Sequence, residues 1–159
     1  MEKRVYLETT IVSYLTARPS RDVIVLAHQH VTREWWEKRR QDYELYVSQL
    51  VVDEAGSGDA EAARLRLGAI AGLPVLAVND AVSVLATELV IEHALPQDAI
   101  EDAFHIALAS VHGIDFLVTW NCAHIANAER MGAIRATVAA MGYECPVICT
   151  PEEMLGESA

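Results

Sequence analysis

The sequence is poor in cysteine and in long apolar runs, and each shortage excludes a class of protein. It has three cysteines, Cys122, Cys145 and Cys149. A secreted domain built on disulfides usually has more of them and an even number, so this class is excluded. We expect them to be small buried side chains. No apolar stretch approaches the roughly 18 residues of a membrane-spanning helix. The first apolar run meets Glu8 too early for a signal peptide, so we expect a cytoplasmic protein without membrane contact.

Basic residues are also scarce. Twelve Lys and Arg stand against 23 Asp and Glu, which gives a formal net charge of -11. This balance argues against a protein that coats nucleic acid through a basic surface. It leaves a nuclease possible, because carboxylates that hold a metal ion add to the negative count. It also suits a basic protein partner, which would be attracted over long range.

What the chain does have is a regular alternation of predicted strands and helices. Its 159 residues, 52% of them hydrophobic, are enough for one domain with a core, so we expect a single domain over 1–159. We expect strands at 4–8, 43–48, 74–78, 114–121 and 146–151. We expect helices at 9–16, 21–40, 49–55, 59–72, 79–96, 97–112 and 123–142, the last in one or two pieces, and a final helical turn at 151–155. This alternation predicts an α/β fold with a central, mostly parallel sheet of four or five strands.

The longest predicted helix gives the most detailed local expectation. Ser20 is a plausible N-cap for the helix 21–40. The spacing of apolar residues predicts an inward face made of Val23, Leu26, Ala27, Val31 and Trp35.

Four polar side chains stand near the carboxyl ends of the predicted strands. Glu8 closes the first strand, and Asn121 follows the fourth. Glu54 lies on the short helix after the second strand, and Asp102 lies on the long helix before the fourth. In open parallel sheets, ligands bind outside the carboxyl ends of the strands. We therefore expect these four residues to form one site.

Asp102 is the most informative of the four, because its helix is otherwise almost entirely apolar. A carboxylate on a buried helix is costly unless it is paired or bound to a metal. Asp98, four residues earlier, would lie on the same face, and the repulsion between the two suggests a cation near them. Alternatively, Asp98 and Glu101 only cap the start of the helix.

The other acids also have simpler explanations. Glu8 alone could cap the helix 9–16, and Glu54 could be a solvated helix end. Asp53 is an alternative to Glu54, since neighbours on a helix point about 100° apart and only one can face a site. Oxygen ligands of this kind select Mg²⁺ or Mn²⁺. His105, three residues after Asp102, is expected to pack or to support the site rather than to react.

Four segments together resemble a PIN domain, in particular its VapC-like toxin branch. They are VYLETTIVSYL (5–15), QLVVDEAGSGDAEAA (49–63), EDAFHIALAS (101–110) and FLVTWNCAHIAN (116–127). The resemblance implies a three-layer α/β/α fold and hydrolysis of RNA that depends on Mg²⁺ or Mn²⁺. It also implies a homodimer and a cognate antitoxin whose basic or aromatic tail fills the acidic pocket.

The resemblance further implies roles for individual residues. Glu8, Glu54, Asp102 and Asn121 take the places of the family's metal-binding and catalytic residues. Thr10 and Thr119 match hydroxyl residues that support them.

Two positions depart from the family pattern. Glu8 replaces an aspartate, and Asn121 stands where many members have another acid. The alternative is therefore a degenerate PIN module that binds RNA or a protein without cleavage. A phosphatase with an aspartyl nucleophile is set aside, because it would need an aspartate at the end of the first strand.

Overall fold

A parallel sheet with helices on both faces forms the body of the molecule. The computed structural model describes residues 1–156. In these residues the strands are β1 (Lys3–Leu7), β2 (Tyr43–Ser48), β3 (Val75–Leu76), β4 (Phe116–Val118) and β5 (Val147–Cys149). All neighbouring strands are parallel, in the order β3-β2-β1-β4-β5. The predicted fold class is confirmed.

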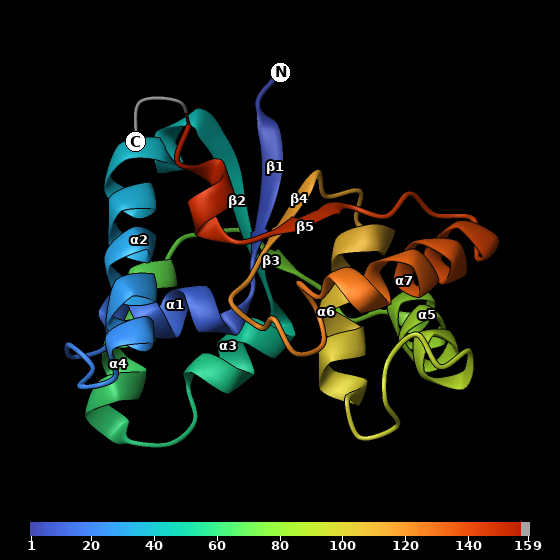
Figure 1. Ribbon diagram of the computed structural model, residues 1–159, viewed down its shortest axis with the longest axis horizontal. Coiled ribbons are helices and arrows are strands. Elements are labelled where there is room, and N and C mark those ends of the chain that lie inside the picture. The colour runs from blue at the N-terminus through green and yellow to red at the C-terminus, as the bar shows by residue number, and fades with distance from the viewer. Residues whose placement is uncertain (157–159) are drawn as a thin grey trace.

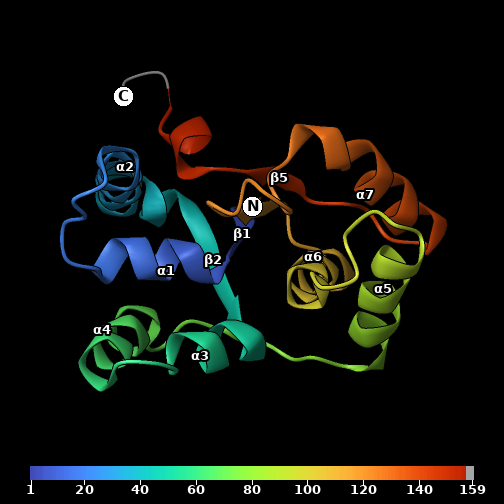
Figure 2. The ribbon, with the colours of Figure 1, turned by 60° about the horizontal axis from the view of Figure 1, so that its bottom comes forward.

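The helices divide between the two faces of the sheet (Figures 1 and 2). They are α1 (Thr9–Thr16), α2 (Val23–Arg39), α3 (Gln49–Ala55), α4 (Ala60–Ile70), α5 (Asp80–Ile91), α6 (Ile100–Val111) and α7 (Ala128–Ala140). Two 3₁₀ turns, η1 (Arg40–Asp42) and η2 (Pro151–Met154), complete the described elements. Helices α1 to α4 lie on one face and α5 to α7 on the other (Figure 2). No helix of the described part is long and apolar enough to cross a membrane.

The strand order creates a crevice beside β1 and β4. From β1 the chain proceeds through β2 to β3, and it then returns across the sheet to β4 on the far side of β1. Since crossovers between parallel strands are right-handed, this reversal puts the connecting helices on opposite faces. Open α/β sheets bind ligands at the carboxyl ends of the strands where the order reverses. Glu8 and Asn121 follow the two strands that meet there.

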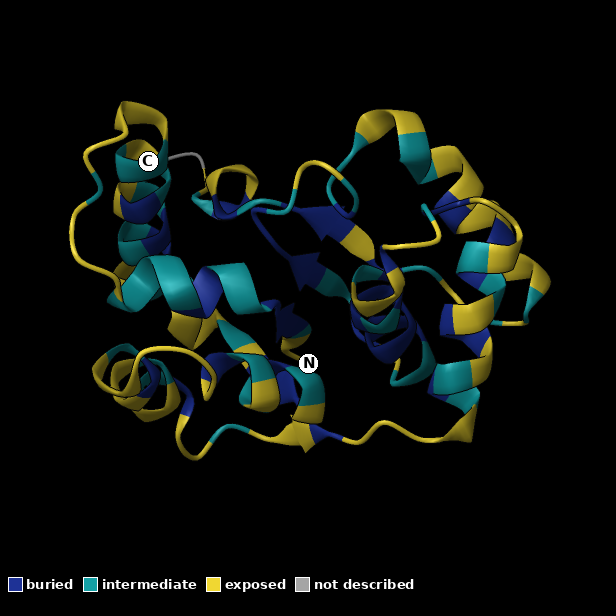
Figure 3. Ribbon diagram, turned by 90° about the horizontal axis from the view of Figure 1, so that it is seen from below, coloured by how far each residue is buried: buried dark blue, intermediate teal, exposed yellow. Residues whose placement is uncertain are grey.

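The core lies between the sheet and the inner faces of the helices. Tyr6, Leu7, Trp35, Ile106 and Leu117 are completely buried. Figure 3 shows the strands and much of α6 as buried, while the outer helix faces are exposed. Of the three free cysteines, Cys149 is buried and Cys145 is half-buried, but Cys122 is exposed. The expectation that all three are buried is therefore wrong for Cys122.

The long helix α2 differs from its prediction at its start. Asp22, not Ser20, is the N-cap, and its Oδ1 accepts the N–H groups of Ile24 and Val25, both at 3.0 Å. Ser20 instead accepts the N–H of Asp22 in the preceding turn. Val23 is 76% exposed and Ala27 is also exposed, so their assignment to the inward face was wrong. The helix is rotated so that Gln29, Thr32 and Trp35 are its buried residues.

Other elements are shorter than the sequence suggests. Strand β3 pairs only through Val75 and Leu76, as suits a short edge strand. Helix α5 ends at Ile91, well before the predicted stop near Pro96. Residues 123–127 form turns, so α7 is a single helix that begins at Ala128, with Asn127 as its cap.

Candidate active site

Glu8 stands at the end of β1, and one of its carboxylate oxygens is held by three donors. Its Oε1 accepts the N–H of Thr10 at 3.1 Å, the hydroxyl of Thr10 at 2.5 Å and the hydroxyl of Thr119 at 2.7 Å. Glu8 is thus also the N-cap of α1. The cap and the site are not alternatives, because one oxygen serves the cap while Oε2 faces the space beside His105, 4.0 Å from its Nε2. Both predicted supporting hydroxyls, Thr10 and Thr119, are in contact with Glu8.

Glu54 is held from two sides at the end of α3. Its Oε1 accepts the hydroxyl of Thr9 at 2.6 Å and lies 2.8 Å from His105 Nε2. Burial would raise the pKa of Glu54, but the hydrogen bonds from His105 and Thr9 outweigh it and lower the pKa below its ordinary value. Asp53 points elsewhere and accepts the side-chain amide of Gln49. Of the two neighbouring acids, Glu54 therefore faces the cluster.

Asp102 forms a second group with residues of the loop after β4. Its Oδ1 accepts the side-chain amide of Asn121 at 3.0 Å, and its Oδ2 lies 2.7 Å from His124 Nδ1. Asn121 also accepts the backbone N–H of His124 through Oδ1. The amide of Asn121 is therefore a donor to Asp102, a role that an aspartate at this position could not fill.

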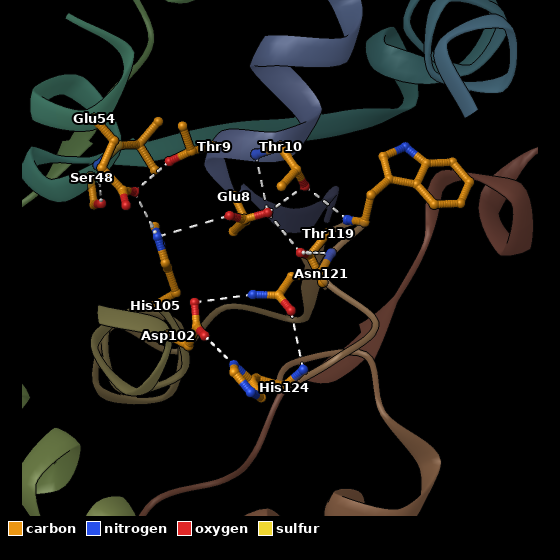
Figure 4. Close-up of polar contacts among 12 residues, drawn as sticks. Glu8, Thr9, Thr10, Ser48, Glu54, Asp102, His105, Thr119, Asn121 and His124 are labelled. Carbon is orange, nitrogen blue, oxygen red and sulfur yellow. Dashed lines mark hydrogen bonds and ion pairs between the residues drawn. The ribbon is translucent and has the colours of Figure 1, made fainter. Parts of the chain in front are cut away.

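The two groups meet at Thr119. Its hydroxyl donates to Glu8 and accepts the backbone N–H of Asn121 at 2.9 Å. Figure 4 shows Glu8, Glu54, Asp102 and Asn121 turned toward a common space, with His105 between the two glutamates and Asp102. The structure thus brings together the four predicted site residues, from β1, α3, α6 and the β4–α7 loop.

One predicted supporting residue is not part of this cluster. Asp98 lies before α6, which begins at Ile100 instead of residue 97, and it is exposed. The segment in front of the helix is a turn in which Ala99 N–H bonds to the Pro96 carbonyl. Asp98 is therefore not on a helix face shared with Asp102, and the expected cation between them has no support. It does not cap the helix either, because the N-cap is Ala99 and makes no side-chain cap bond.

Sequence reasoning did not identify every contact that holds the site. His105 was expected to pack or to support the site, and it contacts Glu54 and Tyr6 directly. Ser48 precedes a helix, which is a recognisable N-cap signal, but its contact with Tyr6 has no sequence signature. The hydrogen bond of His124 to Asp102 depends on the path of the β4–α7 loop, which the sequence does not define.

The side chains of the site offer the kind of ligand atoms that bind divalent cations. Three carboxylates and one amide oxygen are hard ligands that suit Mg²⁺ or Mn²⁺. Glu8 Oε2 accepts no hydrogen bond from residues 1–156, although its side chain is only 6% exposed. Within those residues, however, no three His, Cys, Asp or Glu side chains are grouped as a metal site. Glu54 and Asp102 bind protein donors, so an ion would have to replace some of these contacts.

Comparison with known proteins supports the fold. No family model and no curated protein matches the sequence. Among solved structures, the chain is similar to the crystal structure of VapBC2 from Rickettsia felis bound to a DNA fragment from their promoter. The TM-score is 0.59 at 15% identity, over 92% of this chain and 98% of that chain. At this identity the likeness establishes the fold alone, and it agrees with the three-layer PIN-like α/β/α fold that the resemblance implied.

Proposed function

We propose that this protein is a metal-dependent endoribonuclease and the toxin half of a toxin–antitoxin pair. The observation that supports this most is the convergence of Glu8, Glu54, Asp102 and Asn121 at the crevice of a VapC-like PIN fold. These residues come from four separate elements. Capping or solvation of single acids does not explain why all four lie together at one edge of the sheet.

Glu8, Glu54, Asp102 and the carbonyl oxygen of Asn121 would hold Mg²⁺ or Mn²⁺. When bound, such an ion supplies charge stabilisation at a phosphoryl oxygen and lowers the pKa of a water molecule. The chain itself positions the ligands. Thr10 and Thr119 orient Glu8 through one oxygen, which leaves Oε2 for the ion. Asn121 and His124 orient Asp102 through its two oxygens, Oδ1 and Oδ2 respectively.

The proposed partner is an antitoxin with apolar and basic side chains. An apolar cleft of about 290 Å³ lies between α3 and α6, lined by Leu50, Val78, Ile100 and Phe104 and bordered by Asp53 and Glu101. The same helices place the neighbouring residues, Glu54 and Asp102, in the site. The cleft and the acids therefore lie on the same two helices, which suits a segment with an apolar anchor and a Lys or Arg. We further propose a single domain over 1–159 that acts in the cytoplasm as a homodimer.

The decisive experiment is cleavage of a mixed panel of structured and single-stranded RNAs. The purified protein is assayed with Mg²⁺, with Mn²⁺ and with EDTA. We expect cleavage with either metal, and loss of cleavage with EDTA and in Asp102→Asn. Asp53→Asn is the matched control, because it removes the same charge from a neighbouring exposed acid outside the cluster. Cleavage that survives in Asp102→Asn would contradict the assignment.

The second candidate is a PIN module that binds RNA or a protein without cleavage. It is favoured by one observation: Glu54 and Asp102 already bind protein donors, and no three His, Cys, Asp or Glu side chains of residues 1–156 are grouped as a metal site. A folded protein that cuts no RNA with either metal, yet binds RNA or a partner, would support this function.

A further inference from the structure

A buried series of hydrogen bonds leads from the start of α3 to Glu54 at its other end. Ser48 Oγ lies 2.8 Å from the Tyr6 hydroxyl, and that hydroxyl lies 2.7 Å from His105 Nδ1. His105 Nε2 lies 2.8 Å from Glu54 Oε1. Ser48, Tyr6 and His105 are almost completely buried. Figure 4 shows the His105 ring pointing toward Glu54.

The N-cap of α3 determines the direction of the series. Ser48 Oγ accepts the N–H of Val51 at 3.1 Å, which is the cap bond of the helix. The hydroxyl proton of Ser48 then needs an acceptor, and among the described residues the neighbouring oxygen is that of Tyr6. Tyr6 must consequently donate its own proton to His105 Nδ1. This leaves the imidazole proton on Nε2, where it is donated to Glu54.

The opposite direction leaves buried groups unsatisfied. If Tyr6 donated to Ser48, the Ser48 proton would lack an acceptor in a site with no exposure. A proton on Nδ1 alone would place the bare nitrogen lone pair of Nε2 against the Glu54 carboxylate.

We propose that Ser48 and Tyr6 are positioning residues that fix the tautomer and orientation of His105, and that His105 thereby fixes the carboxylate of Glu54. The Glu54 side chain is 29% exposed, so these contacts restrict a group that could otherwise rotate toward solvent. Ser48 begins the same helix that presents Glu54, which couples the start of α3 to its functional end. The consequence for metal binding rests on the proposed function, whereas the tautomer of His105 does not.

The test combines NMR of the histidine ring with titration of Mn²⁺. Long-range proton–nitrogen spectra of ¹⁵N-labelled protein report which imidazole nitrogen is protonated. Mn²⁺ affinity is measured by electron paramagnetic resonance without RNA. The variants are Tyr6→Phe, which keeps the packed ring, and Ser48→Ala. Their matched controls are Tyr46→Phe, which loses a hydroxyl that donates to the exposed Glu44, and Asn79→Ala, which loses the N-cap bond of α5.

We expect the wild-type His105 to be protonated on Nε2, with Nδ1 as a hydrogen-bonded acceptor. In Tyr6→Phe the Nδ1 signal should shift to that of an unbonded nitrogen, and Mn²⁺ affinity should fall roughly 10- to 100-fold. Ser48→Ala should change both in the same direction by less, and neither control should change them. A wild-type proton on Nδ1, or unaltered Mn²⁺ affinity in Tyr6→Phe, would overturn the proposal. A wild type that binds no Mn²⁺ would instead contradict the proposed function, and the NMR signals would still decide the tautomer.

Discussion

At the scale of single residues, Glu8 shows how a longer acid is accommodated where the resembled family has aspartate. The extra methylene lets Oε1 reach Thr119 on the loop after β4 while it still accepts the N–H of Thr10. The hydroxyl of Thr119 is completely buried and depends on this acceptor. Glu8 therefore joins two neighbouring strand ends, in addition to its proposed role as a ligand.

Glu8→Asp should consequently weaken the site, although it restores the family's residue. The shorter side chain can still cap α1 but withdraws from Thr119, which leaves a buried hydroxyl without its acceptor. We expect a loss of about 2 kcal/mol in the free energy of unfolding, measured in urea, and weaker Mn²⁺ binding. Glu2→Asp, at an exposed position, is the control. An aspartate variant that is equally stable and binds Mn²⁺ more tightly would refute this account.

At the scale of elements, Trp120 attaches the β4–α7 loop to the helices on one face. Its indole Nε1 donates to Thr32 on α2 at 2.7 Å, and its ring stacks on His28 at 3.9 Å between centroids. Its backbone N–H donates to the hydroxyl of Thr10 at 2.9 Å. The loop that positions Asn121 is therefore held by α1 and α2. The bond from Trp120 also explains why the polar side chain of Thr32 is buried on α2.

Trp120→Phe should destabilise the protein much more than the same change at Trp36. It removes the bond to Thr32 and leaves space in a buried site, so we expect a loss of about 2–3 kcal/mol in the free energy of unfolding. Trp36 is only partly buried, with Arg40 over its ring at 4.1 Å, and its replacement should cost no more than about 1 kcal/mol. Urea unfolding of both variants provides the measurement. Equal losses would show that the contacts of Trp120 add little.

At the scale of the whole molecule, the net charge of -11 is the dominant property. Excess charge of one sign opposes the compact state through self-repulsion. The convergence of Glu8, Glu54 and Asp102 adds a local concentration of negative charge. General screening and specific cation binding should therefore both stabilise the fold, by separable amounts.

Thermal unfolding should separate these two effects. Raising the NaCl concentration from about 10 mM to about 150 mM shortens the Debye length from roughly 30 Å to 8 Å, and we expect the Tm to rise. At equal ionic strength, Mn²⁺ should raise the Tm further in the wild type and less in Asp102→Asn. An equal response of the two proteins would mean that the divalent ion acts only by screening.

Local patterns in the sequence predicted the order of elements and the main site residues. Glu8, Glu54 and Asp102 could be found because acids are conspicuous where strands end or on an apolar helix. Which of Asp53 and Glu54 faces the site could not be decided, since it depends on how α3 is rotated against its neighbours. Asp98 was misplaced because the turn after Pro96 delays the start of α6 by three residues.

The sequence by itself determined the α/β class and the acids near the strand ends, because propensity and periodicity act over a few residues. Only the tertiary structure decided how these acids are held. The hydrogen bonds of Thr119 to Glu8, of Asn121 to Asp102 and of His105 to Glu54 join residues that are far apart in the chain. Such contacts depend on strand order and crossover geometry, which arise when the whole sheet is assembled.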